Sequence, residues 1–335
     1  MSNFDLQIET DKTEVVGGET ISGKVKVRSQ KDYNTNAITL SLGWYTHGFG
    51  NGDRGQAAQE TLYTGRIIAG RPYEFPFQFQ LPNGPVTYRG KLVNVDWDLN
   101  AQADISWKID PKAEAELYLT EPGPDGPYEP GNPSDDVLVD RERSLRTGSR
   151  WGLVILVPFL LVGAGFLYAG ITGFDLFMLL FGVLFLGVPL IGLSVVLRNT
   201  VAEKRIGEVT VEMPDQVSPG EVCPIRIAFT PNASGTINGV KVTLTGKERA
   251  TAGSGTNRRT KSHVLGTVEV EDSAAAHMRL LPGKPVESRL DVQIPQDAAL
   301  SFYASDNSVK WEIAVRVDIP GWPDWLEKRD VIVVP

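Results

Sequence analysis

Five basic side chains crowd one short stretch of the chain, "KERATAGSGTNRRTK". They are Lys247, Arg249, Arg258, Arg259 and Lys261. In a chain of net charge −8 such a cluster is unusual. Basic groups attract anionic lipid headgroups with about 1 kcal/mol per residue near a membrane surface, and they also bind acidic groups of protein partners. The sequence therefore predicts a lipid- or partner-binding loop here, with a solvated mobile loop as the alternative.

Residue types that support catalysis or metal binding are sparse. The three histidines, His47, His263 and His277, are far apart in the sequence, and no Cys or His stands at ligand spacing from them. No Ser-His-Asp order or G-x-S-x-G elbow is visible. The single cysteine, Cys223, excludes an internal disulfide, and it shares the apolar phase of its strand with Ile225 and Ile227. We expect a core cysteine, no enzymatic activity, no metal and no cofactor.

The stretch "GNGDRG", Gly50 to Gly55, fits the pattern G-x-G-x-x-G. As a nucleotide fingerprint this pattern must follow a strand and open a helix within a βαβ unit. Here strand-like sequence stands on both sides, so the stretch predicts a flexible hairpin loop. The acidic balance of the chain argues against nucleic-acid binding, which relies on Lys and Arg.

A duplicated strand pattern indicates the architecture. The stretch "VDWDLNAQADI" at 95–105 returns 214 positions later as "VKWEIAVRVDI", each with apolar and polar residues in alternation. Other strand-like pairs recur at spacings of 202 to 214. Short strands separated by Gly, Pro, Asn and Asp are typical of β-sandwiches. We predict a mainly β protein with two immunoglobulin-like sandwiches at 1–120 and 206–335, and Trp97 and Trp311 in their cores.

Between the two copies lies an apolar run at 150–198, in which Asp175 is the only charged residue between Arg150 and Arg198. A spanning helix needs roughly 20 apolar residues, so the run predicts a transmembrane hairpin with spans at about 151–171 and 176–197. The alternative is a buried hairpin of a soluble protein. No charged residue marks a transport path, which favours an anchor.

The charges beside the hairpin predict its orientation. Lys and Arg collect on cytoplasmic flanks, and the connecting turn has neither. We therefore expect an integral protein of a plasma or inner membrane, with both soluble domains cytoplasmic and the turn on the opposite side. The basic flanks are Arg141, Arg143, Arg146, Arg150, Arg198, Lys204 and Arg205.

The linker at 121–149 is rich in Pro and Gly and acidic at its start. Such composition favours a disordered or extended tether. The N-terminal sandwich should then move more freely than the C-terminal one, unless the two dock.

These features together resemble the arrestin family, which has tandem N-type and C-type sandwiches. The marks in the first copy are Pro82, Tyr88, Gly90, Val95 and Trp97, and those in the second are Pro295, Phe302, Val309, Trp311 and the closing "DIPGW". The resemblance covers both soluble domains. It implies a two-lobed scaffold that binds other proteins, often membrane proteins, and catalyses no reaction. The inserted hairpin and linker depart from that family.

From these observations we expect a membrane-anchored, arrestin-like scaffold or adaptor, whose partners are membrane-associated proteins and the lipid bilayer. Two alternatives remain. One is a non-catalytic subunit of a larger membrane complex, whose hairpin packs on partner helices. The other is a small-ligand-binding or enzymatic cleft between the lobes. The sequence leaves the partner, the pathway and the oligomeric state open.

Overall fold

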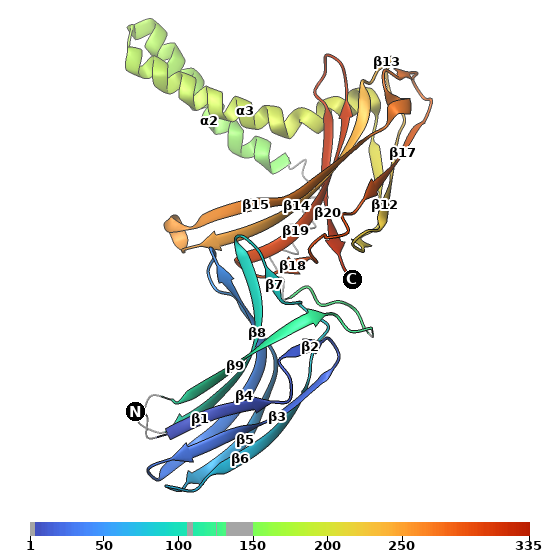
Figure 1. The fold of residues 1–335 in the computed structure, drawn as a ribbon. Coiled ribbons are helices and arrows are strands. Elements are labelled where there is room, and N and C mark those ends of the chain that lie inside the picture. The colour runs from blue at the N-terminus through green and yellow to red at the C-terminus, as the bar shows by residue number, and fades with distance from the viewer. Residues whose placement is uncertain (1–3, 106–109, 125, 132–149) are drawn as a thin grey trace.

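The computed structural model describes residues 4–105, 110–124, 126–131 and 150–335, without the side chains of 150–157, 188, 189 and 191–200. Its architecture is mainly β, with two sheet-rich domains (Figure 1). We call the domain of strands β1 to β9 the N-terminal sandwich and the domain of strands β10 to β20 the C-terminal sandwich. The two stand end to end, and a helical hairpin projects from the C-terminal sandwich.

The N-terminal sandwich packs a small sheet on a large one. The small sheet has the order β1-β3-β6, and the large sheet has the order β2-β9-β8-β4-β5 with β7 added beside β8. The strands are β1 (Phe4–Thr10), β2 (Glu14–Val16), β3 (Thr20–Ser29), β4 (Tyr33–Gly48), β5 (Arg54–Ile67), β6 (Tyr73–Gln80), β7 (Tyr88–Arg89), β8 (Val93–Ile105) and β9 (Lys112–Glu121).

The C-terminal sandwich repeats this arrangement. Its small sheet has the order β10-β12-β17, and its large sheet has the order β11-β20-β19-β14-β15 with β18 beside β19. The strands are β10 (Val209–Glu212), β11 (Gln216–Val217), β12 (Val222–Phe229), β14 (Gly239–Ala252), β15 (Arg259–Glu271), β17 (Val286–Gln293), β18 (Phe302–Tyr303), β19 (Asn307–Asp318) and β20 (Trp325–Val333). It adds the pair β13 (Gly235–Thr236) and β16 (Arg279–Leu280), and two short 3-10 helices, η1 (Gly255–Asn257) and η2 (Ser273–Ala275).

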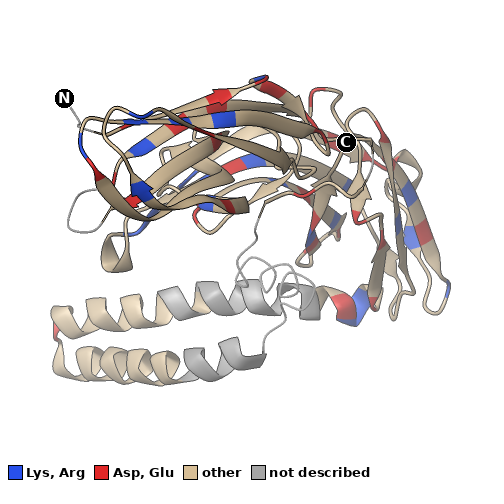
Figure 2. Cartoon of the chain, turned by 90° about the horizontal axis from the view of Figure 1, so that it is seen from below, with Lys and Arg blue, Asp and Glu red and all other residues tan. Residues whose placement is uncertain are grey.

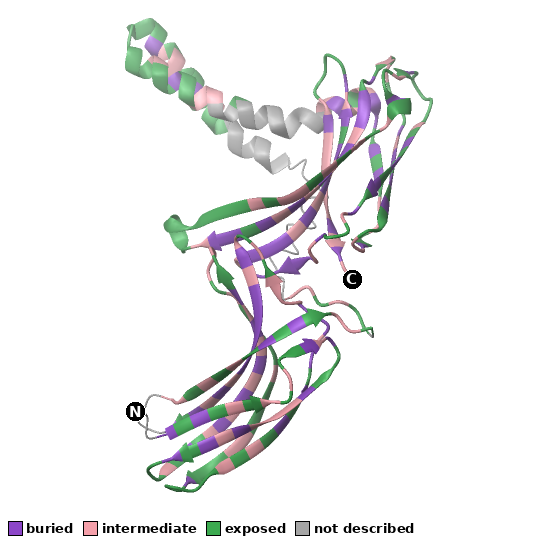
Figure 3. Ribbon diagram, viewed as in Figure 1, coloured by how far each residue is buried: buried purple, intermediate pink, exposed green. Residues whose placement is uncertain are grey.

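The duplication extends to individual hydrogen bonds. Trp97 lies opposite Leu117 and Trp311 opposite Val331, which are equivalent registers. The Trp97 indole Nε1 donates to the carbonyl of Pro85 at 2.7 Å, and the Trp311 indole donates to Ala299 at 2.9 Å. Both acceptors lie 12 residues before their tryptophan. Both indoles are buried, as the alternation predicts, and Figure 3 shows the same banding of buried residues along both large sheets.

Helices α2 (Arg150–Gly173) and α3 (Leu176–Ile206) form the hairpin. Asp175 caps α3, since its carboxylate accepts from the backbone N–H groups of Phe177 and Met178. A Cβ on Gly163 or Gly182 would come within 3.0 Å of the facing helix, so these glycines allow close packing. Figure 2 shows no charged residue on the described part of the hairpin except at its tip and at its end beside the C-terminal sandwich.

Within the part of the chain that the structure describes, no helix has both the length and the apolar character needed to cross a bilayer. The two predicted membrane spans are therefore not confirmed. The two helices themselves are present at the predicted positions.

The last turn of α3 belongs to the C-terminal sandwich. Ala202 and Ile206 are fully buried in its core. The Trp325 indole donates to Glu203 Oε1 at 3.1 Å, and the Arg205 guanidinium lies over the Trp322 ring. The hairpin is thus joined to this sandwich by packing as well as by the chain.

Candidate functional site: the interface between the sandwiches

The two sandwiches meet through equivalent ends of their large sheets. The N-terminal sandwich contributes the end of β4, the loop after it and the turn between β7 and β8. The C-terminal sandwich contributes the end of β14, β18 and the start of β19 (Figure 1). The contact is reciprocal, because β7 reaches β14 while β18 reaches β4.

Glu248 on β14 is the central group of the interface. Its side chain is fully buried. Its carboxyl group accepts from the Tyr88 hydroxyl at 2.7 Å, from the Lys91 N–H at 3.0 Å and from the Leu92 N–H at 2.7 Å. These three donors belong to the other sandwich. Hydrogen bonds from these donors offset the cost of removing the carboxyl group from water. Because donors and acceptor belong to different sandwiches, the bonds form only while the sandwiches are docked.

Gly90 makes this arrangement sterically possible. A Cβ at this position would lie 1.9 Å from Glu248 Oε1. Burial first, and then the hydrogen bond to Glu248, raises the pKa of the Tyr88 phenol. Tyr88 and Gly90 are two of the marks on which the family resemblance rests, and here they form the socket for Glu248.

A second set of polar contacts lies beside Glu248. The Asn307 amide, which is buried, donates to Thr46 Oγ1 at 3.0 Å, to the Asn51 carbonyl at 2.6 Å and to Asp53 Oδ2 at 2.7 Å. The Asn51 side chain in turn donates to the Gly253 carbonyl and accepts from its N–H. These bonds connect the β4–β5 loop to the C-terminal sandwich.

The "GNGDRG" stretch supplies that loop, and it is a hairpin connection as predicted. A Cβ on Gly50 would lie 2.3 Å from Asn307 Oδ1. A Cβ on Gly55 would lie 2.3 Å from the Trp44 ring. These two glycines therefore allow close packing. The G-x-G-x-x-G pattern alone does not distinguish glycines needed for packing from glycines that bind a nucleotide.

Apolar contacts surround the polar ones. The Trp44 and Phe302 rings meet edge to face with centroids 5.4 Å apart. Phe302 stands at the position of the C-terminal sandwich that matches Tyr88 at the 214-residue spacing. One continuous hydrophobic cluster includes Phe302 and Val309 together with the core of the N-terminal sandwich.

The first part of the predicted tether lies against this interface. We call residues 122–131 the strap; residue 125 is outside the described residues. The Tyr128 hydroxyl donates to the Ser301 carbonyl at 3.2 Å, and the Tyr303 N–H donates to the Pro130 carbonyl at 2.7 Å. The sequence predicts free movement of the N-terminal sandwich only if the two sandwiches do not dock. In the structure they dock. The rest of the linker, 132–149, lies outside the described residues.

The five predicted basic residues do not form one patch. Lys247 and Arg249 lie on the outer face of β14, whereas the strand register places Lys261 on the opposite face, with its ammonium 4.1 Å from the centroid of the Phe49 ring. Lys247 pairs with Glu312, and Arg258 pairs with Asp306. Arg249 and Arg259 are exposed. Partner or lipid binding by this loop stays a prediction.

Sequence reasoning passed over Glu248 and Asn307. Glu248 stands between the two predicted basic residues Lys247 and Arg249. The signal was its phase, because Val242, Leu244 and Ala250 share its inward face on β14 and are all buried. A carboxyl group on this apolar inward face needs hydrogen-bond donors, and here they come from the other sandwich.

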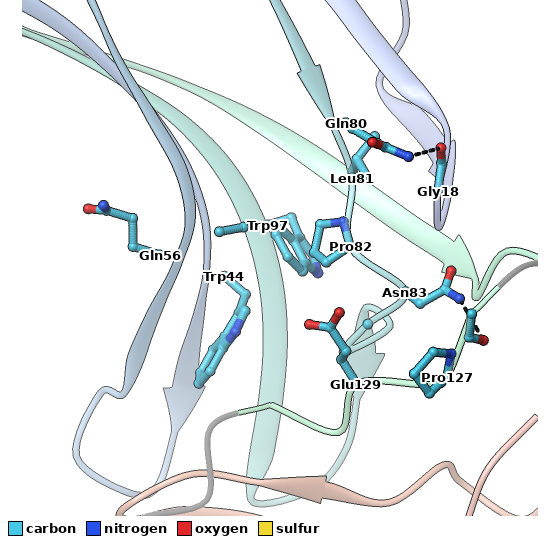
Figure 4. A pocket seen from close by; sticks show the side chains of 13 residues that line it. Gly18, Trp44, Gln56, Gln80, Leu81, Pro82, Asn83, Trp97, Pro127 and Glu129 are labelled. Carbon is cyan, nitrogen blue, oxygen red and sulfur yellow. Dashed lines mark hydrogen bonds between the residues drawn. The ribbon is translucent and has the colours of Figure 1, made fainter.

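A cavity of about 500 Å³ lies at the end of the N-terminal sandwich, beside the strap (Figure 4). Its walls include Trp44, Trp97, Pro82 and Asn83 of the N-terminal sandwich, together with Pro127 and Glu129 of the strap. Among the described residues that line it, Glu129 is the only ionisable one. The alternative of a ligand-binding or enzymatic cleft requires ionisable groups that converge on a pocket, and the described residues of this cavity supply one such group.

The other reactive candidates have structural settings. Cys223 is fully buried, and burial raises the pKa of its thiol to about 11. His47 contacts Asp96, with 2.7 Å between Nε2 and Oδ2. Among the residues that the structure describes, no group of three or more His, Cys, Asp or Glu side chains is placed to hold a metal ion.

Comparison with known proteins adds little. No family model matches the chain, and no curated protein matches it. Among solved structures, the chain is similar to Spo0M, a sporulation control protein from Bacillus subtilis, at 12 % sequence identity. The match covers 87 % of this chain and 91 % of that one, with a TM-score of 0.32. A likeness this loose says nothing about the function of this chain, and the fold rests on its own strand pairings.

Proposed function

We propose that this protein is a membrane-anchored scaffold that binds other proteins through its docked sandwiches and catalyses no reaction. One observation carries the anchoring. Of the 20 large hydrophobic side chains that are exposed in the described residues, 14 lie between Phe159 and Leu190. Phe174 at the tip is 95 % exposed. Exposure of so large an apolar surface to water is unfavourable, so something must cover it. The hydrocarbon core of a membrane would cover both helices of the hairpin at once.

The scaffold part of the proposal is supported by the docked interface and by the arrestin resemblance of the sequence. A body in which buried hydrogen bonds join two lobes presents its outer surfaces at a fixed relative position. Such preorganisation favours protein binding, because little conformational freedom is lost when the partner docks. The basic residues beside the hairpin support an orientation with both lobes on the cytoplasmic side of a plasma or inner membrane, because Lys and Arg collect on that side.

Fractionation of cell membranes tests the anchor. The native chain should stay in the membrane pellet through an alkaline carbonate wash. A variant with Leu161→Lys, Leu184→Lys and Leu190→Lys, three exposed positions near the middle of the predicted spans, should move to the supernatant, because each Lys near the centre of a membrane helix costs about 2.5–3.5 kcal/mol. The matched control places three lysines at exposed strand positions, with Thr61→Lys, Gln78→Lys and Thr267→Lys, and should stay in the pellet. Extraction of the native chain by carbonate contradicts the anchor.

A second experiment separates an anchor from a subunit whose hairpin packs on partner helices. The hairpin is exchanged for an unrelated two-helix hairpin of the same length, and partners are recovered by crosslinking in cells from each sandwich. A scaffold keeps its partners after the exchange. If the partners are lost while the exchanged protein stays in the membrane and folded, the hairpin itself is the binding surface and the subunit reading holds.

A further inference from the structure

The strap is held as a bound peptide is held, by contacts to both sandwiches. On the N-terminal side, Asn83 Nδ2 donates to the Gly126 carbonyl at 3.1 Å, and Asn83 Oδ1 accepts from the Gly123 N–H at 2.8 Å. Figure 4 shows the Asn83 side chain directed at this part of the strap. On the C-terminal side, the Tyr128 hydroxyl donates to the Ser301 carbonyl, and the Pro130 carbonyl accepts from the Tyr303 N–H.

The groove walls fit an extended backbone closely. A Cβ on Gly84 would lie 2.4 Å from the Glu129 carbonyl oxygen and 2.7 Å from the Tyr128 ring. Within the strap itself, a Cβ on Gly131 would lie 2.6 Å from the Tyr303 carbonyl oxygen of the groove wall. Main-chain bonds on one side and a tightly fitted aromatic ring on the other are the means by which grooves recognise extended peptides.

Tyr128 is the anchor of the strap. Burial raises the pKa of its phenol, and its ring reaches from the Gly84 wall of one sandwich to the Ser301 carbonyl of the other. Pro127 and Pro130 flank the Tyr128–Glu129 pair. Proline restricts the free peptide to extended conformations and so lowers the entropy lost on binding. The cavity beside Pro127 and Glu129 leaves room for a longer side chain in place of either.

From this geometry we propose that the groove between the sandwiches is a binding site for extended Pro-Tyr-x-Pro segments, and that the strap occupies it in cis. The inference rests on the proposed scaffold function for its biological meaning and names the chemistry of the partner segment. The strap follows β9 directly, so its effective concentration at the groove is on the order of millimolar or higher. A segment of another protein therefore binds in trans only where the strap is released.

Fluorescence anisotropy with purified full-length protein in detergent tests the site. The probe is a labelled peptide with the sequence of residues 122–131, and its control peptide has Ala in place of Tyr. The probe should bind a Tyr128→Ala variant at least tenfold more tightly than it binds the native chain. The matched variant Tyr118→Ala, which changes an exposed tyrosine on β9 outside the groove, should behave like the native chain. Adding Asn83→Ala to Tyr128→Ala should weaken probe binding again.

Proteolysis supplies a readout that does not depend on how well the variant folds. A protease that cuts after tyrosine should cleave the native chain slowly at Tyr128, whose following residue is Glu129. Excess unlabelled probe peptide should accelerate that cut several-fold, while the Ala control peptide should not. The proposal is overturned if Tyr128→Ala binds the probe no better than Tyr118→Ala does and excess peptide leaves cleavage of the native chain at Tyr128 unchanged. Either result leaves the carbonate test of the membrane anchor unaffected.

Discussion

The N-terminal and C-terminal sandwiches share one topology, yet at equivalent positions they do different work. Thr46 and Glu248 match at the 202-residue spacing and both face the other sandwich. The Thr46 hydroxyl accepts one hydrogen bond, from the Asn307 amide, whereas the Glu248 carboxyl group accepts from three donors. Tyr88 and Phe302 match at the 214-residue spacing, and one makes a hydrogen bond where the other makes an aromatic contact. The duplicated parts therefore hold each fold, and the positions that differ join the two.

The attachments of the two sandwiches differ as well. The C-terminal sandwich incorporates the last turn of α3, through Ala202 and Ile206. The N-terminal sandwich contacts the strap through Asn83. One copy is thus fixed to the hairpin by a helix and the other is fixed to its neighbour by a peptide-like segment. This division suits the membrane-anchored scaffold that we propose.

The largest expected effect tests what the copies share. Trp97→Ala and Trp311→Ala should each cost about 3–5 kcal/mol of unfolding free energy, because each removes a buried indole and leaves a carbonyl without its donor. Urea unfolding of the C-terminal sandwich can be monitored by the alkylation of Cys223, which is buried in the folded state. Ile21, its match at the 202-residue spacing, is also fully buried, so Ile21→Cys in a Cys223→Ala background reports the N-terminal sandwich. A cost below about 1 kcal/mol at one tryptophan would contradict the equivalence of the two cores.

The next effect tests what the copies do not share. Glu248→Ala should destabilise the docked state by about 2–4 kcal/mol, since it leaves the Tyr88, Lys91 and Leu92 donors without an acceptor. Thr46→Ala should cost about 1 kcal/mol. Distances between spin labels on the two sandwiches should broaden for Glu248→Ala and change little for Thr46→Ala. Equal broadening in the two variants would show that Glu248 has no special part in docking.

A smaller effect concerns Arg249 and Arg259 of the basic loop, both of which are exposed. Arg249→Ala together with Arg259→Ala should weaken binding to vesicles that contain anionic lipid by about 2 kcal/mol, at about 1 kcal/mol per charge. The matched control is Lys261→Ala, whose ammonium lies over Phe49 within the molecule. Flotation of hairpin-substituted protein with vesicles, at low and high salt, gives the measurement. If the double variant floats as the parent does, the loop does not bind lipid.

The smallest effect is a pH dependence at the interface. The pKa of Tyr88 is raised in the folded protein, so its stabilising contribution is complete below the unfolded-state pKa of about 10 and is lost as pH rises through the folded-state value. Between pH 10 and 11 the native chain should lose roughly 1 kcal/mol more than Tyr88→Phe does. Urea midpoints at pH 8, 10 and 11 check this. Parallel midpoint curves would assign the alkaline loss to other tyrosines.

The local elements were predictable from the sequence by itself. Alternation along 95–105 and 309–319 determined two strands with buried tryptophans, because side chains of a strand alternate between a dry and a wet face. The two apolar runs on either side of Asp175 determined two helices, since an apolar run of about 20 residues is too long for a single strand. Cys223 was placed in the core by the same alternation, and it is fully buried.

Only the tertiary structure decided how the two sandwiches meet. Glu248 is a charged residue among Lys247 and Arg249 in the sequence, and its three donors lie 156 to 160 positions away. The five basic residues adjoin in sequence but separate onto two faces, because a strand sends neighbours to opposite sides. The strap has the composition of a tether, and its order comes from Asn83, Ser301 and Tyr303, which local sequence cannot bring together. Contacts between distant segments depend on the shape of the docked whole, and for that reason periodicity and composition did not reveal them.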